Sequence, residues 1–153
     1  MPEINQPKIK QHAVSMGQGS HLEGAAAVRL LADGLSTLQN QVAPATATGA
    51  ATLTAAQLKT KIISGTPAGA VDYTLPTGAL MDAAFTNWAV DESFDFSIQN
   101  LATNAAFIIT VAAGSGFTIV GQARIDANAG TANAVGRFRV RKTAAETFVA
   151  YRI

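Results

Sequence analysis

Three acidic residues, Asp91, Glu92 and Asp95, lie close together near the middle of the sequence. Neighbouring carboxylates can serve as the acid and base of glycoside hydrolysis, and they can also bind Ca²⁺. The three residues do not have the spacing of an EF-hand loop, and they lie at a predicted turn before a strand, where acidic side chains are common. We therefore expect a solvated turn here rather than a catalytic pair.

The remaining residue types that carry chemistry are sparse. His12 and His21 are separated by more than the H-x-x-x-H or H-E-x-x-H spacing of metal sites. The glycine-containing segments 17–19 and 114–116 lack the lysine and the strand-to-helix context of phosphate-binding loops. The absence of cysteine excludes disulfides and thiolate nucleophiles. We expect no enzymatic activity, no metal, no cofactor and no small-molecule substrate.

Arg137, Arg139 and Arg141 alternate with apolar residues, so they project from one face of a predicted strand. Such a comb could follow nucleic-acid phosphates, but no aromatic residue shares its face, as a single-strand binder would need. The formal net charge of +1 also provides no field that would gather nucleic acid or an anionic membrane. We predict neither as a partner, and expect a charged outer face or a contact with an acidic protein surface.

Charges are segregated along the chain. Residues 62–123 contain five acidic and no basic side chains, whereas residues 124–153 contain six basic and two acidic ones. Acidic and basic strands could neighbour each other in one sheet, where facing opposite charges attract. Alternatively, the charges could meet across a subunit interface. In that case the arginines at 137, 139 and 141 would pair with Asp91, Glu92 and Asp95 of a neighbouring copy.

The elements that would position these residues are mainly strands. In residues 92–100, Phe94, Phe96 and Ile98 alternate with polar residues, which is typical of a half-buried strand. Further strands are predicted at 71–75, 107–111, 117–120, 122–128, 136–141 and 147–153, with 107–111 and 117–120 forming a hairpin. We predict a mainly β fold, an antiparallel β-sandwich or jelly-roll-like domain.

Short helices accompany these strands. Thr54 and Gln57 form a T-x-x-Q capping box, which predicts a helix that continues through Ile62 and Ile63 to a stop at Gly65. Thr77 is the predicted cap of a further helix at residues 79–85.

The N-terminal part has a different composition. Residues 1–19 predict an extended arm that docks on a neighbouring subunit, and a disordered tail is the alternative. The apolar side chains that would dock are Ile4, Ile9, Val14 and Met16. An S-x-x-E capping box at Ser20 opens a predicted helix with a coiled-coil spacing of apolar residues. These are Val28, Leu31, Leu35, Leu38 and Val42. Two heptads are short, so packing of this helix on the β domain is an equal alternative.

A low-complexity segment at residues 43–51 marks the predicted domain boundary. We assign residues 1–48 to the arm, helix and linker, and residues 49–153 to the β-rich domain. No apolar run has the length of a signal peptide or a membrane span, so we expect a soluble protein that is not secreted by that route. With 14% charged residues and many alanines, the surface must be unusually uncharged, which is typical of chains in assemblies.

Four segments, at residues 51–58, 73–80, 93–100 and 136–142, resemble virion structural proteins of tailed bacteriophages, including cyanophages. Within that group the sequence is most similar to capsid decoration, or cement, proteins. The resemblance implies a β-rich homotrimer on the capsid exterior, made in the host cytoplasm, without catalysis or cofactor. It also implies an N-terminal segment that contacts the major capsid protein, and it carries over no catalytic residues.

The alternative within this resemblance is a head-fibre, tail-fibre or spike module that binds host surface polysaccharide. Such modules usually expose several Trp and Tyr residues that stack on sugars, and this chain has one Trp and two Tyr. The scarcity of these residues favours the decoration protein.

Overall fold

The computed structural model describes residues 41–129 and 133–153, within a compact unit that spans Gln41–Ile153. The predicted arm, the S-x-x-E helix and most of its apolar series lie outside the described residues. These predictions concern Ile4, Ile9, Val14, Met16, Val28, Leu31, Leu35 and Leu38. Val42, the last member of the series, is described and is 50% exposed.

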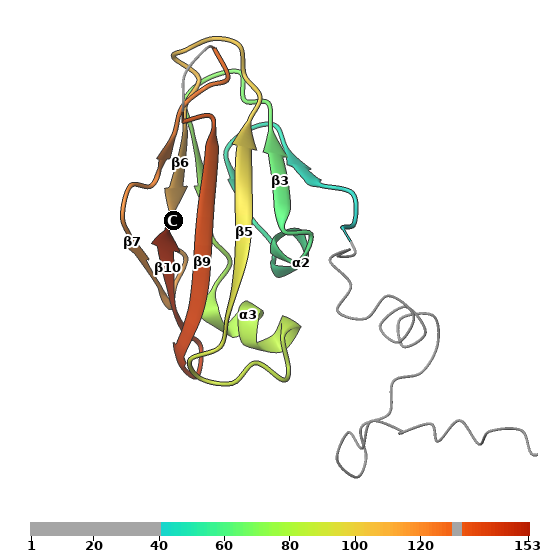
Figure 1. Cartoon of the computed structure of the whole chain (residues 1–153), viewed down its shortest axis with the longest axis vertical. Coiled ribbons are helices and arrows are strands. Elements are labelled where there is room, and N and C mark those ends of the chain that lie inside the picture. Colours follow the sequence, from blue (N-terminus) through green and yellow to red (C-terminus); the bar gives the residue numbers. More distant parts are fainter. Residues whose placement is uncertain (1–40, 130–132) are drawn as a thin grey trace, which may run out of the picture. The chain divides into compact units, whose positions relative to one another are not determined.

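The described unit is mainly β and contains two sheets (Figure 1). The six-stranded sheet has the order β1 (Ala45–Ala47), β3 (Ile62–Gly65), β5 (Ser93–Asn100), β9 (Val135–Ala144), β10 (Thr147–Arg152) and β7 (Phe117–Val120). The four-stranded sheet has the order β2 (Ala51–Thr52), β4 (Val71–Thr74), β6 (Ile109–Ala112) and β8 (Arg124–Ile125). Buried side chains of both sheets form one core cluster, so the predicted mainly β class is confirmed.

The prediction of an antiparallel domain is wrong, because most strand pairs are parallel. Strands β1, β3 and β5 run parallel in one sheet, as do β2, β4 and β6 in the other. From β1 to β9 the chain changes sheet at every connection, and up to β6 each strand returns to its sheet in the same direction as the previous one. The later strands give the antiparallel pairs, which are β6 with β8, β5 with β9, and β9 with β10. Period-2 alternation reports only which face is buried, and it is the same for parallel and antiparallel strands.

The predicted hairpin of residues 107–111 and 117–120 is also wrong. β6 lies in the four-stranded sheet and β7 lies in the six-stranded sheet, where it pairs with β10. The connecting turn carries the chain across the core, and Gly116 takes a left-handed conformation there, with φ of 84°. A glycine-containing turn between two apolar strands therefore does not by itself indicate that the strands pair.

Both predicted helix starts are confirmed. α2 (Ala55–Lys59) begins at the capping box, in which the Thr54 hydroxyl accepts from Gln57 N and the Gln57 side chain accepts from Thr54 N. α3 (Gly78–Ala84) begins after Thr77, whose hydroxyl accepts a hydrogen bond from Leu80 N at 3.3 Å.

The predicted end of the first helix is wrong, because α2 stops at Lys59 and β3 begins at Ile62. Lys61 between them has a φ of 65°, which turns the chain into the sheet. The branched side chains of Ile62 and Ile63 favour a strand, and Ile63 is fully buried in the core.

Residues 43–51, which we predicted as a linker, contain β1 and the first residue of β2. Ala47 of β1 is buried, and its carbonyl accepts a hydrogen bond from the Tyr73 hydroxyl at 2.6 Å. Burial raises the pKa of the Tyr73 phenol above its ordinary value. Low sequence complexity therefore did not prevent this segment from joining the sheet, because alanine fits where a strand approaches a bulky core side chain.

A row of aromatic rings follows the inner face of the six-stranded sheet towards α3. Phe138 stacks on Phe96 with a centroid distance of 5.5 Å, Phe96 is 6.2 Å from Phe94, and Phe94 stacks on Phe85 at 5.2 Å. The row starts in the buried core and ends at half-buried rings beside α3. The half-buried rings therefore form part of the surface at the α3 end of the domain.

Candidate functional site

The outer face of the six-stranded sheet holds the arginines that the sequence singled out. Phe138 and Val140 of β9 are fully buried, whereas Arg137 and Arg139 point outward and are exposed. The predicted alternation along this strand is confirmed. We use the name outer face for the outward side chains of β5, β9, β10 and β7.

Two of the arginines pair with acidic residues of the same chain. Arg139 makes a two-point contact with Asp95 on the adjacent strand, with N–O distances of 2.7 and 2.8 Å. Arg141 contacts Asp91 at 2.5 Å and donates to the Tyr151 hydroxyl at 3.3 Å. Of the two explanations for the segregated charges, the structure therefore shows pairing within one sheet for Arg139, and pairing with the turn before β5 for Arg141.

Arg137 and Glu92 differ from the other charged residues of this set. Arg137 faces Ser97 in the strand register and has no ion pair among the described residues. Glu92 contacts none of the arginines, and its carboxylate accepts a hydrogen bond from Ala89 N at 2.8 Å. The structure thus leaves one predicted cation on the outer face available to another molecule.

Pairing on the outer face lowers the pKa of an acidic group and raises the pKa of a basic one. The hydrogen bond from Arg139 lowers the pKa of Asp95 below its ordinary value, and the positive charge of Arg137 contributes in the same direction. Hydrogen bonds with Tyr151 and Asp91 raise the pKa of Arg141. Asp95, Arg139 and Arg141 are therefore held in their charged forms.

Apolar side chains lie beside the arginines on the same face. Val120 of β7 is 47% exposed and lies next to Tyr151 in the register, and Tyr151 faces Arg139. Val135 at the start of β9 is 46% exposed. Ile153 is 52% exposed and donates its backbone N–H to Arg137 O at 3.0 Å. The outer face thus mixes exposed apolar groups with internally paired charges.

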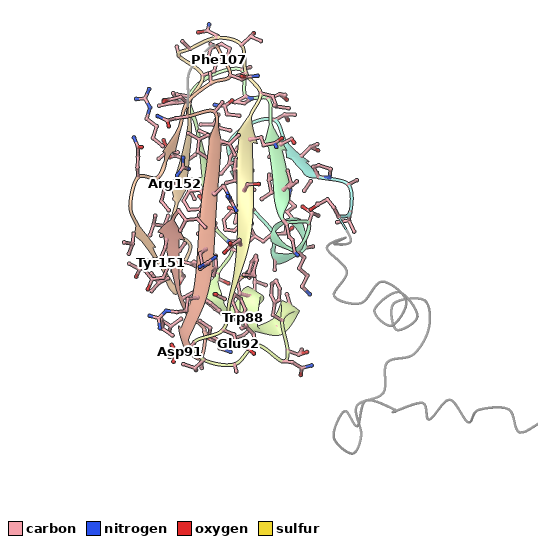
Figure 2. The ribbon with its side chains drawn as sticks, viewed as in Figure 1. Trp88, Asp91, Glu92, Phe107, Tyr151 and Arg152 are labelled. Atoms are coloured by element: carbon pink, nitrogen blue, oxygen red, sulfur yellow. The ribbon has the colours of Figure 1, made fainter. Side chains whose placement is uncertain are left out.

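A second feature, which the sequence pattern did not predict, is an open groove beside α3. Its volume is about 700 Å³, and its lining includes the half-buried rings of Phe85, Trp88 and Phe94. Asp91 and Glu92 form part of its rim. Figure 2 shows Trp88, Asp91 and Glu92 together at the α3 end of the domain, opposite the end that carries Phe107.

The three rings support one another. Trp88 lies 5.0 Å from Phe85, 5.3 Å from Phe94 and 4.9 Å from the buried Phe148, all as distances between ring centroids. The Lys59 ammonium sits over the Phe85 ring, 4.6 Å from its centroid, and donates to Ala84 O. The wall is therefore a fixed surface anchored in the core.

Lys142 of β9 holds the loop that carries this wall. Its ammonium forms an ion pair with Asp82 of α3 at 2.7 Å and donates to Trp88 O at 3.1 Å. Its backbone N–H donates to Glu92 O, and its carbonyl accepts from Asp91 N. Hydrogen bonds from Lys142 and Glu146 N lower the pKa of Asp82. One residue thus ties α3, the loop and the sheet together.

The groove could have been suspected from the spacing of Phe85, at the predicted end of a helix, and Trp88, just after it. The sequence gives no sign that Phe94 joins them. The predicted turn at Asp91 and Glu92 is present, and its Asp91 takes a left-handed φ of 70°. What the pattern did not indicate is that this turn forms the rim of a cavity.

Within residues 41–129 and 133–153, no group of three or more metal-ligating side chains could hold a metal ion. No helix in the same part of the chain is long and apolar enough to cross a membrane. In comparisons with known proteins, no family model, no curated protein and no solved structure matches this chain.

Proposed function

We propose that this chain is a virion structural protein of a tailed bacteriophage, a cement protein that decorates the outside of the head as a homotrimer. In this proposal the two sheets act as a β-sandwich that presents the outer face to neighbouring subunits. The observation that carries it is the composition of that face, with exposed apolar side chains next to arginines whose charges are already matched. The sequence resemblance supports the same function.

Matched charges make the outer face suitable for burial in an assembly. An arginine without a partner would be strongly destabilising if a second subunit covered it, because its charge would be uncompensated. Arg139 and Arg141 are already paired with carboxylates of the same chain, so a subunit that covers them does not bury an uncompensated charge. Arg137 is left to meet an acidic group of the neighbour, for which the carboxylates of Asp91, Glu92 and Asp95 in another copy are candidates.

The N-terminal segment completes the proposal. Ile4, Ile9, Val14 and Met16 are more apolar than a solvated tail requires, and we propose that they anchor the trimer on the major capsid protein. A ligand that binds only the assembled lattice stabilises it by RT ln(1 + [L]/Kd) at each site. Three anchors on one trimer increase the effective concentration of each, so weak single contacts give firm attachment.

Sedimentation of the purified chain tests the assembly. We expect a trimer at micromolar concentration, and we expect the double substitution Val120→Ser/Val135→Ser to shift it towards monomer. Leu80→Ser is the matched control, because Leu80 is 57% exposed but lies on α3, away from the outer face. A wild-type chain that stays monomeric at all concentrations would exclude the proposed trimer.

Electron microscopy of phage particles with and without this protein tests its location. Density for three-fold clusters on the outside of the head, lost when the protein is absent, is the expected result. Density on a fibre or tail instead would exclude the decoration role. Removal of residues 1–40 should leave a folded β unit that no longer binds heads, and unchanged occupancy by the shortened chain would exclude the anchor.

A further inference from the structure

We propose that the groove beside α3 binds an uncharged oligosaccharide. This inference does not depend on the decoration role, because neither binding nor decoration requires the other. It rests on four properties of the groove: its size, its aromatic wall, its hydrogen-bonding rim and the rigidity of its loop.

Size and wall suit a sugar. A volume of about 700 Å³ falls within the range of pockets that hold small ligands, roughly 300–1,000 Å³. A pyranose ring has one face made of C–H groups, and these carry partial positive charge that is attracted to the negative face of an aromatic ring. Phe85, Trp88 and Phe94 are half-buried, so each keeps some ring surface towards the groove.

The rim supplies partners for hydroxyl groups. One oxygen of the Glu92 carboxylate, Oε2, accepts from Ala89 N at 2.8 Å, which fixes the side chain and leaves Oε1 to accept from a ligand. The exposed Asn87 side chain makes no hydrogen bond to another described residue and offers a donor and an acceptor. An acceptor and an amide beside an aromatic wall match the hydroxyl rim of a sugar ring.

The charges of the groove favour an uncharged ligand. Asp91 is paired with Arg141, whereas the Lys59 ammonium donates to Ala84 O, a neutral acceptor that leaves its positive charge in place. The Lys59 ammonium and the Glu92 carboxylate have opposite signs, so the groove offers no net charge that would attract acidic sugars or phosphates. A cationic ligand would need the face of Phe85, where the Lys59 ammonium already lies.

The loop is held ready for binding. Lys142 contributes three hydrogen bonds to it: the side chain bonds Trp88 O, and the backbone bonds Asp91 N and Glu92 O, at distances of 2.9–3.1 Å. Rigid binding surfaces lose less conformational freedom when a ligand binds, so more of the contact energy appears as affinity.

Trp88 is the single tryptophan of the chain, so its fluorescence reports the groove directly. The probes are three uncharged tetrasaccharides, maltotetraose, cellotetraose and chitotetraose, titrated into the full-length protein. Tetragalacturonate serves as the acidic probe and choline as the cationic probe. We expect a saturable change in Trp88 emission with at least one uncharged tetrasaccharide, with a Kd of about 1 mM or lower. We expect none with tetragalacturonate or choline.

Two substitutions locate the binding. Glu92→Gln keeps an oxygen that can accept from Ala89 N but removes the carboxylate, and Asn87→Ala removes the free amide. Each should weaken binding by about fivefold, the effect of losing one hydrogen bond. Asp72→Asn is the matched control, because Asp72 is exposed on β4 outside the groove, and it should bind as the wild type does.

Circular dichroism and the thermal midpoint establish that each variant is folded. If Glu92→Gln does not fold, Asn87→Ala still tests the site. The Asn87 side chain makes no hydrogen bond to another described residue, so its removal should not disturb the fold. The proposal is overturned if none of the three tetrasaccharides gives a saturable change at about 20 mM, well above the expected Kd. It is also overturned if only tetragalacturonate or choline binds, or if both groove substitutions leave the affinity unchanged.

Discussion

The outer face of the six-stranded sheet and the groove beside α3 organise their charged residues in different ways. On the outer face, Arg139 and Asp95 meet across neighbouring strands, and both side chains remain largely accessible to water, with 52% and 34% of each exposed. At the groove, the Lys142 and Asp82 side chains are 14% and 22% exposed. The first arrangement presents charge to other molecules, whereas the second uses charge to hold a loop in place.

This contrast shows that similar ion pairs have different functions depending on what they connect. The outer-face pairs join strands whose backbone hydrogen bonds already hold them together. The Lys142 pair joins α3 to the sheet, and the same ammonium holds the loop at Trp88. Removing a charge should therefore alter surface properties in one region and the fold in the other.

The largest effect is expected from Lys142→Met. This substitution leaves the Asp82 carboxylate without its cation and removes the bond to Trp88 O, so the free energy of unfolding should fall by about 2 kcal/mol at pH 7. Urea unfolding measures it, and Arg137→Met is the matched control, with a change within about 0.5 kcal/mol. Equal losses in the two variants would show that the groove loop does not depend on Lys142.

Most strands, but not their pairing, could be predicted from the sequence. Alternation at Phe94, Phe96 and Ile98 fixes the buried face of β5, and the threonine caps fix both helix starts. The order of strands depends on which sheet each connection enters, and that depends on contacts between distant residues. Gly78, for example, could not carry a side chain because Glu146 O lies in the place of its Cβ.

The two candidate sites also differ in how far the sequence predicts them. The arginines of the outer face come from one strand, so a local pattern revealed them, and even then their partners were not determined. The groove combines Lys59 at the end of α2, the loop after α3 and Phe94 of β5, and Lys142, far along the chain, holds that loop. A site assembled from separate elements leaves no continuous signal in the sequence.

An effect of intermediate size is expected on the pH dependence of folding stability. The folded-state pKa of Asp82 lies below its value in the unfolded chain, so its stabilising contribution is complete above about pH 5 and is lost as the pH falls through the folded pKa. Asp82→Asn should therefore lower stability at pH 7 and make stability depend less on pH between about pH 5 and pH 3. Thermal midpoints across this range measure both effects.

Asp95→Asn provides the comparison from the outer face. The pKa of Asp95 is also lowered, so the sign of the effect is the same, but a third of its side chain is exposed and water screens the interaction. We expect a smaller change in slope than for Asp82→Asn. A larger change for Asp95→Asn would mean that the outer-face pair, and not the groove pair, carries the acid sensitivity.

The smallest effect is expected within the outer face itself, where it separates the paired arginine from the unpaired one. Arg139→Ser should lower the thermal midpoint slightly at low salt, and the difference from the wild type should vanish near 1 M NaCl, where the screening length is about 3 Å. Arg137→Ser should change the midpoint less than Arg139→Ser does, because Arg137 has no ion pair among the described residues and attracts Asp95 only weakly, without a hydrogen bond.

In self-association we expect the opposite ranking, with a larger effect from Arg137→Ser than from Arg139→Ser. If Arg137 meets an acidic group of a neighbouring subunit, Arg137→Ser weakens self-association and makes it less sensitive to salt than in the wild type. Arg139→Ser leaves a carboxylate on the face without its partner, so the salt dependence of association should remain. Concentration-dependent sedimentation at two ionic strengths distinguishes the variants. Identical association and identical salt dependence for Arg137→Ser and the wild type would return Arg137 to the role of a solvated surface charge.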